Sequence, residues 1–266
     1  MILKNLTISI MKLILSLLVV VAVTVLSCDK NTYHVTDRIS SEGSAQVKLG
    51  YFSAYTVLPN TILYINGKAV SNTLTAPVGF PGGGFNTGGS SNGDYLWVTP
   101  GNTTIQGFQP VPATGNIQKK LFEFTQQFDV DKFYTFYITD TAANTAGFSV
   151  PDTREAPDSG FAKIKFVNAM PNVPALDLYK GATNASATLF APNVPYKGYT
   201  EDFVIPLPSD SFFIRPANAP ASTAPITRRA FASSLTNRRI YTLVARGYNG
   251  ATATNLLPNL SVVINQ

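Results

Sequence analysis

The chain has 266 residues, of which 45% are hydrophobic and only 13% are charged, and its formal net charge is +5. This charge is mild for the length and no long basic block occurs, so the composition argues against a nucleic-acid partner. One histidine and one cysteine are too few for a His- or Cys-based metal site and exclude an internal disulfide, so we expect no metal and no other cofactor.

The N-terminal segment has the features of an export signal. Leu13–Leu26 is an uncharged apolar run after Lys12, too short to cross a hydrocarbon core of about 30 Å as a helix. At its end, residues 25–28 (VLSC) resemble the lipobox of bacterial lipoproteins, a family in which the cysteine is acylated and becomes the mature N-terminus. We therefore expect residues 1–27 to be a cleaved lipoprotein signal peptide and Cys28 to carry the lipid, with a plain signal peptide or a signal anchor as alternatives.

Residues 28–44 are polar, lack an apolar period and are expected to form a lipidated flexible tether. They contain His34, whose place in a tether argues against a role in nucleophilic catalysis. Together with the lipobox, the tether predicts an outer-membrane lipoprotein that faces either the periplasm or the cell exterior. Whether translation starts at Met1 or at Met11 stays open.

The rest of the chain consists of short alternating segments separated by Gly and Pro turns, a pattern typical of strands. Four blocks of its first half recur in the same order in its second half: 45–53 with 161–169, 61–67 with 175–181, 98–105 with 207–214, and 124–138 with 231–245. We therefore predict a tandem duplication with domains at 45–157 and 158–266. Segments with one apolar face favour an all-β fold of two immunoglobulin-like antiparallel β-sandwiches, with a small barrel as the competing shape.

Residues 160–181 (GFAKIKFVNAMPNVPALDLYKG) resemble the opening motif of the DUF4397 family, and a looser likeness extends over the first half. The residues that match the family pattern are Asn168, Ala169, Pro171, Asp177, Tyr179 and Gly181. The resemblance implies paired β-sandwich modules at the cell envelope of bacteria, frequently Bacteroidota and often lipid-anchored. It implies no reaction, because the family has no generally established activity.

Three groups of carboxylates are candidates for acid–base chemistry or for calcium: Asp129 with Asp131; Asp152, Glu155 and Asp158; and Glu201 with Asp202. None has the spacing of a calcium loop, and the first pair has no counterpart in the second half. We therefore expect no catalytic residue and no metal site, and we expect Asp177 to cap a turn.

The glycine-rich stretch 79–94 lacks the Lys and Ser/Thr of a phosphate-binding loop, so it is either a long hairpin connection or a recognition loop. In the second case, Phe80 and Phe85 would supply apolar contacts. Trp97 lies on an alternating strand and is either a core residue or a platform for a sugar.

Two arginine pairs are candidates for contact with an anionic partner or, alternatively, are solvated charges that guard a sheet edge: Arg228, Arg229, Arg238 and Arg239. Asp140-Thr141-Ala142 resembles an O-glycosylation signal of exported Bacteroidota proteins, with Thr141 as the acceptor. The function we predict is a non-enzymatic, lipid-anchored binding or structural module whose partners are the membrane and a polysaccharide or envelope protein. The alternatives are a glycan-binding accessory lipoprotein of a nutrient-uptake system and a hydrolase that uses carboxylates alone.

Overall fold

The computed structural model describes residues 42–55, 57, 59–75, 77–81, 94–110, 119–220, 222–231 and 235–266. Their regular structure is β-strand apart from two short 3₁₀ turns, Ala142–Asn144 (η1) and Thr254–Leu256 (η2), so the predicted all-β class is confirmed. Among these residues, no helix is long and apolar enough to span a membrane. The expected signal peptide, Cys28 and His34 lie outside the described residues.

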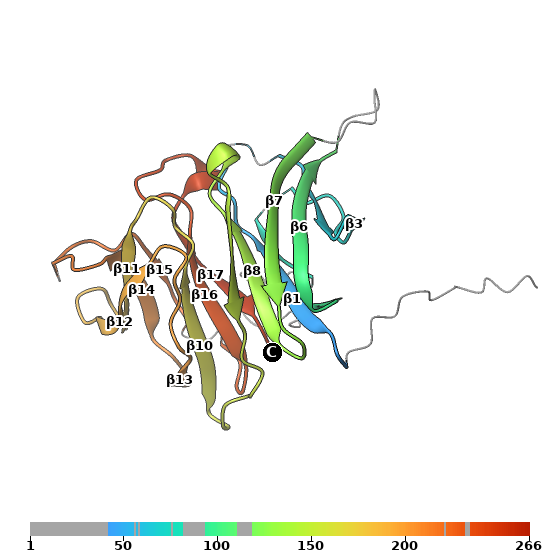
Figure 1. Cartoon of the computed structure of the whole chain (residues 1–266). Coiled ribbons are helices and arrows are strands. Elements are labelled where there is room, and N and C mark those ends of the chain that lie inside the picture. The colour runs from blue at the N-terminus through green and yellow to red at the C-terminus, as the bar shows by residue number, and fades with distance from the viewer. Residues whose placement is uncertain are drawn as a thin grey trace, which may run out of the picture. The chain divides into compact units, whose positions relative to one another are not determined.

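The first half of the body forms a β-sandwich, which we call module 1 (Figure 1). One of its sheets has the order β4-β1-β8-β9, with β5 also paired to β1, and the other has the order β3-β2-β6-β7. The strands are β1 (Ala45–Tyr51), β2 (Ile62–Ile65), β3 (Lys68–Ala69), β4 (Val78–Phe80), β5 (Leu96–Val98), β6 (Gly101–Gln109), β7 (Lys119–Phe128), β8 (Phe133–Thr139) and β9 (Ala146–Pro151).

The second half forms another β-sandwich, module 2, with sheets of order β13-β10-β16-β17 and β12-β11-β14-β15. Its strands are β10 (Phe161–Asn168), β11 (Ala175–Gly181), β12 (Thr188–Pro195), β13 (Phe203–Pro206), β14 (Ser211–Pro216), β15 (Thr227–Arg229), β16 (Ile240–Arg246) and β17 (Asn259–Ile264).

The strand order differs from the expected immunoglobulin arrangement. In each module the first strand pairs in parallel with the penultimate one, β1 with β8 and β10 with β16, whereas the other pairs are antiparallel. Lettered A to H in chain order, the sheets of module 2 read D-A-G-H and C-B-E-F, and an immunoglobulin domain has A-B-E-D and C-F-G. The sandwich is thus present, with its first strand in the interior of a sheet.

Each module has its own apolar core, formed by alternate side chains of its two sheets. In β1, the predicted inward face of Val47, Leu49 and Tyr51 is fully buried in the core of module 1. In β10, Ile164 and Phe166 enter the core of module 2 in the same way. The alternation of the sequence therefore predicted correctly which side chains share an inward face.

A third apolar cluster joins the modules. It consists of the buried residues Phe52, Tyr137, Val150, Val167, Ala169, Val244 and Val263, with Phe148 packed against them. These residues lie on the outward faces of sheets β4-β1-β8-β9 and β13-β10-β16-β17, which cover each other (Figure 1). Strands β1, β8, β10, β16 and β17 are consequently buried on both faces, which alternation alone did not predict.

Candidate functional site

The polar part of the contact between the modules is the candidate site, and we call it the clasp: Lys48, Tyr95, Thr135, Asp152, Arg154, Lys165, Thr242 and Asn265. The clasp contains two lysine–threonine pairs. Lys48 on β1 lies beside Thr135 on β8, and Lys165 on β10 lies beside Thr242 on β16. Because their strand neighbours enter the cores, these four side chains point toward the other module.

The two lysines cross between the modules. The Nζ of Lys48 donates a hydrogen bond to the carbonyl oxygen of Ile264, and the Nζ of Lys165 donates one to that of Pro151. Pro151 and Ile264 are the last residues of β9 and β17, which occupy the same place in the two modules. Each module therefore donates a lysine hydrogen bond to the end of the last strand of the other module.

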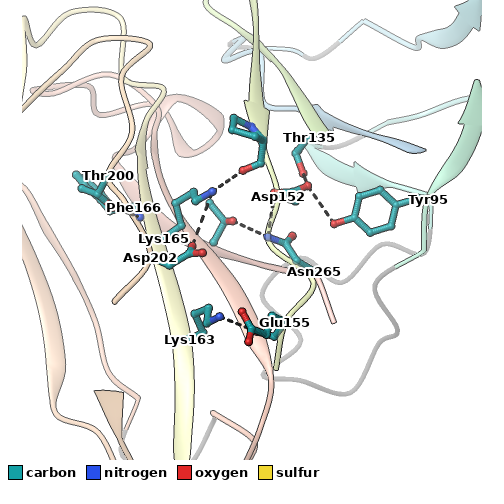
Figure 2. Close-up of polar contacts among 12 residues, drawn as sticks. Tyr95, Thr135, Asp152, Glu155, Lys163, Lys165, Phe166, Thr200, Asp202 and Asn265 are labelled. Carbon is teal, nitrogen blue, oxygen red and sulfur yellow. Dashed lines mark hydrogen bonds and ion pairs between the residues drawn. The ribbon is translucent and has the colours of Figure 1, made fainter. Parts of the chain in front are cut away.

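The carboxylate of Asp152 lies at the centre of the clasp and accepts three side-chain hydrogen bonds (Figure 2). Its Oδ2 accepts from the hydroxyl of Thr135 at 2.6 Å and from that of Tyr95 at 3.0 Å. Its Oδ1 accepts from the Nδ2 of Asn265 at 3.1 Å, and the same amide donates to Thr242 Oγ1 at 2.9 Å. A chain of hydrogen bonds thus runs from β8 of module 1 to β16 of module 2.

Burial governs the electrostatics of the clasp. It raises the pKa of Asp152, against the hydrogen bond from Thr135 and the charges of Lys48 and Lys165, which act to lower it. It lowers the pKa of Lys48 to about 8, although the charge of Asp152 acts to raise it. Burial and the Asp152 charge raise the pKa of Tyr95, which stays a neutral donor. Burial therefore destabilises the ionised forms of both Asp152 and Lys48.

Two cationic side chains complete the clasp. Arg154 lies over the rings of Phe133, at 4.9 Å from the centroid, and Tyr95, at 5.3 Å, and its guanidinium donates to the backbone oxygen of Asn265. Lys165 forms an ion pair with Asp202 at 3.8 Å (Figure 2). The clasp thus includes linker residues 152 and 154 as well as strand residues.

The apolar part of the contact depends on a close approach at Gly50. A Cβ at this position would lie 2.7 Å from Cδ1 of Tyr137 and 2.8 Å from Cε2 of Phe52. The space allows Tyr137 to stack on Phe52, with ring centroids 5.7 Å apart, and on Phe148, at 5.4 Å. These rings of module 1 meet the smaller Val167, Ala169 and Val244 of module 2.

A cavity of about 520 Å³ opens beside the contact, with a lining from both modules: Ala54, Tyr55, Val57, Thr141, Tyr248 and Leu256. The hydroxyl of Tyr248 donates to Asp140, and the hydroxyl of Thr139 donates to the carbonyl oxygen of Ala169 at 2.6 Å. A second cavity, of about 430 Å³, shares Tyr55 and Val57 with the first. The predicted glycosylation residue Thr141 therefore lies at a cavity wall.

Of the residues predicted to bind ligands in module 1, the structure describes Phe80 and Trp97, on two strands that both pair with β1. Phe80 ends β4 and packs against the core of module 1, and Phe85 lies outside the described residues. Trp97 is 49% exposed on β5, while its neighbours Leu96 and Val98 face the core. Of the two residues that the structure describes, Trp97 has the exposure that a sugar platform needs.

The arginine pairs lie on different elements. Arg228 and Arg229 belong to β15, and Arg238 and Arg239 precede β16. Arg229 lies over the ring of Phe231 at 5.9 Å from its centroid, whereas Arg228 and Arg238 are exposed. Both pairs retain exposed positions from which an anionic partner is reachable.

Most of the candidate carboxylates have structural contacts. Asp129 accepts from the hydroxyl of Tyr134 at 3.0 Å, and Asp131 accepts from the backbone N–H of Gly43 at 3.1 Å. Of the linker acids, Asp152 belongs to the clasp, whereas Glu155 and Asp158 are exposed. No group of three His, Cys, Asp or Glu side chains within the described part of the chain is arranged to hold a metal ion.

Asp177 caps a turn, as the sequence predicted. It accepts from the backbone N–H of Asn193 at 2.7 Å and from that of Asn218 at 3.0 Å. Both asparagines have positive φ angles, 51° and 61°. Asn218 lies in the turn after β14, whereas Asn193 lies within β12, where the pairing with β11 is irregular. The marked aspartate of the motif thus stabilises one turn and one irregularity of a strand in module 2.

Sequence reasoning missed most of the clasp. The signal was a lysine between apolar residues in corresponding first strands: Lys48 between Val47 and Leu49, and Lys165 between Ile164 and Phe166. Such a pattern predicts a lysine on a solvated face, which is the usual case. Only the covering module makes these lysines buried.

The chain matches no curated protein in sequence. The family model described as "Domain of unknown function (DUF4397)" matches residues 45–179. The match begins with β1 and ends within β11, so it covers module 1 fully and, of module 2, strand β10 and most of β11. The likeness to the family that the sequence indicated over the first half is therefore present throughout module 1. The chain belongs to the DUF4397 family, which is defined by a domain of unknown function.

Proposed function

We propose that this protein is a non-enzymatic, lipid-anchored protein of the cell envelope whose two modules act together as one binding or structural unit. The clasp carries this proposal. Its acid, amines and amide are used in bonds between the modules, with Lys48 and Asn265 almost fully buried. Groups that are bonded between the modules stabilise the arrangement of the modules and are not available to bind a substrate.

Both modules are, in this proposal, copies of the same family module. Three matching positions support it: Lys48 with Lys165, Thr135 with Thr242, and Asp152 with Asn265. The backbone N–H of Asp152 bonds to the carbonyl of Phe133, and that of Asn265 bonds to the carbonyl of Ile240, at the same place in each module. An unrelated second domain would share neither the strand order nor these positions.

The anchor is tested by metabolic labelling with palmitate. Several acyl chains on Cys28 would hold the protein at the membrane, because one chain alone binds reversibly. We expect the wild-type protein and the Ser27→Ala control, which keeps a small residue before the cysteine, to take up label. Cys28→Ala is expected to take up none. Equal labelling of Cys28→Ala would contradict the anchor.

A glycan-binding accessory role in nutrient uptake is the second candidate, and the exposure of Trp97 favours it. An exposed indole offers an apolar face to a sugar ring. On a glycan array, we expect binding by the wild-type protein to be lost in Trp97→Ala. The control is Val57→Ala, which removes another strongly exposed apolar side chain. Equal binding by wild type and Trp97→Ala would exclude Trp97 as the platform.

Two further contacts belong to the same proposal. Thr141, at the wall of the larger cavity, is an O-glycosylation acceptor, which mass spectrometry of protein from its native host would detect as a glycosylated peptide. The exposed Arg228 and Arg238 are contacts for an anionic polysaccharide or envelope protein. Loss of salt-sensitive binding on their joint replacement by Gln would support that role.

A further inference from the structure

The clasp encloses an amine, a carboxamide and a carboxyl group. Lys48 is 2% exposed and Asn265 is 1% exposed. The Nζ of Lys48 bonds to the carbonyl oxygen of Ile264, the residue directly before Asn265. The carboxamide of Asn265 bonds in turn to Asp152. Amine, carboxamide and carboxyl therefore meet in one cluster, of which the amine and the carboxamide belong to buried residues.

The environment favours the neutral amine, which is the nucleophilic form of lysine. Burial lowers the pKa of Lys48 to about 8 and raises that of Asp152. Both shifts favour transfer of a proton from the ammonium of Lys48 to the carboxylate of Asp152. The transfer yields an uncharged amine and an acid that is able to protonate a leaving group.

The carboxamide of Asn265 is fixed in position. Its Nδ2 donates both to Asp152 Oδ1, at 3.1 Å, and to Thr242 Oγ1, at 2.9 Å. Its Oδ1 is buried and has no hydrogen-bond partner among the residues that the structure describes. The nitrogen that would leave is thus next to the acid, and the oxygen that would gain charge is free to accept a proton or a hydrogen bond.

We propose that Lys48 and Asn265 become joined by an intramolecular isopeptide bond. After the proton transfer, the Nζ of Lys48 attacks Cγ of Asn265, and the electron pair of the C=O bond moves to Oδ1. When the C=O bond forms again, the Cγ–Nδ2 bond breaks, and Nδ2 leaves as ammonia with the proton from Asp152, whose carboxylate then takes up the one proton that Nζ releases. The products are one amide and one ammonia, with no oxidant or cofactor required.

Lys165 is not the nucleophile in this proposal. It forms an ion pair with Asp202 at 3.8 Å. Its Nζ bonds to the carbonyl of Pro151, the residue before Asp152, where a carboxyl group stands in place of a carboxamide. An ionised carboxylate is a poor electrophile. Lys165 therefore lies beside a side chain that resists attack, whereas Lys48 lies beside the carboxamide of Asn265.

The bond would connect β1, the first strand of module 1, to the residue after β17, the last strand of module 2. A covalent link at this place closes the chain around both sandwiches. Either module would then have to unfold while β1 stays joined to the end of β17. Neither the lipid anchor nor a ligand takes part in the formation of this bond.

Tryptic digestion of the purified full-length protein followed by mass spectrometry tests the bond. Lys48 in an amide resists trypsin, so we expect peptide 39–68 joined to peptide 247–266, with a mass lower than the sum of the two by one ammonia, about 17 Da. Separate peptides 39–48, 49–68 and 247–266 would overturn the proposal. A loss of water in a peptide that contains Asp152 would overturn it as well.

Variants separate the roles of the groups. Asp152→Asn keeps the shape of the side chain and removes the acid, so we expect the unlinked peptides. Asp158→Asn makes the same change at an exposed acid of the same linker, outside the clasp, and is expected to keep the link. A link of equal yield in Asp152→Asn would overturn the part assigned to Asp152. Loss of the link in Asp158→Asn as well would contradict the assignment of that part to Asp152 alone.

Discussion

Asp152 and Asn265 occupy matching positions in the two modules and bond to each other, Nδ2 to Oδ1, at 3.1 Å. Each bonds in addition to the threonine of its own module, Thr135 or Thr242. An acid facing an amide allows a hydrogen bond without the repulsion that two carboxylates would have. Because module 2 has an amide where module 1 has an acid, these two side chains are able to face each other across the contact at neutral pH.

The first prediction concerns the acid of the clasp. Asp152→Ala removes the acceptor of Thr135, Tyr95 and Asn265, and buried donors without partners are unfavourable. We expect the free energy of unfolding to fall by about 2–4 kcal/mol. Urea denaturation measures it. Asp158→Ala, an exposed acid of the same linker, is the control and should change stability by less than about 0.5 kcal/mol.

The second prediction is a pH dependence. Because the pKa of Asp152 in the folded protein is raised above its ordinary 3.8, the folded state binds more protons than the unfolded state above that pH. Stability should therefore fall as the pH rises through this window, and Asp152→Asn should remove that part of the slope. Unfolding free energies of both proteins at pH values from about 4.5 to 7 measure the difference. Parallel curves would contradict a raised pKa.

The third prediction concerns Gly50. In Gly50→Ala, the new methyl group would meet the rings of Tyr137 and Phe52, so we expect a loss of about 1–3 kcal/mol. The double variant Gly50→Ala/Tyr137→Ala makes space for the methyl group. It should be less destabilised than the sum of its single changes. Additive losses, measured by thermal or urea unfolding, would show that the close approach does not limit the contact.

The fourth prediction concerns the aspartate of the family motif. Asp177→Ala leaves the N–H groups of Asn193 and Asn218 without their acceptor, and we expect a loss of about 2–3 kcal/mol. Asp210→Ala is the matched control in the same module. Its ion pair with Lys180, at 3.6 Å, is half exposed and should contribute less than about 1 kcal/mol. Equal losses in the two variants would refute the capping role.

The sequence predicted the parts of the fold that depend on local pattern. Val47, Leu49 and Tyr51 share a core because alternate residues of a strand share a face, and this holds whatever the strand pairs with. The strand order was less accessible. The parallel pairing of β1 with β8 joins residues far apart in the chain, and no local pattern distinguishes it from an antiparallel edge.

By itself, the sequence determined the all-β class, the division into two halves and the turn-capping role of Asp177. The tertiary structure decided what covers the outward faces of the sheets, and so converted Lys48 and Asn265 from surface residues into buried groups of one cluster. The physical reason is that a period of two shows which side chains point the same way, whereas burial and pKa depend on the element that packs over them.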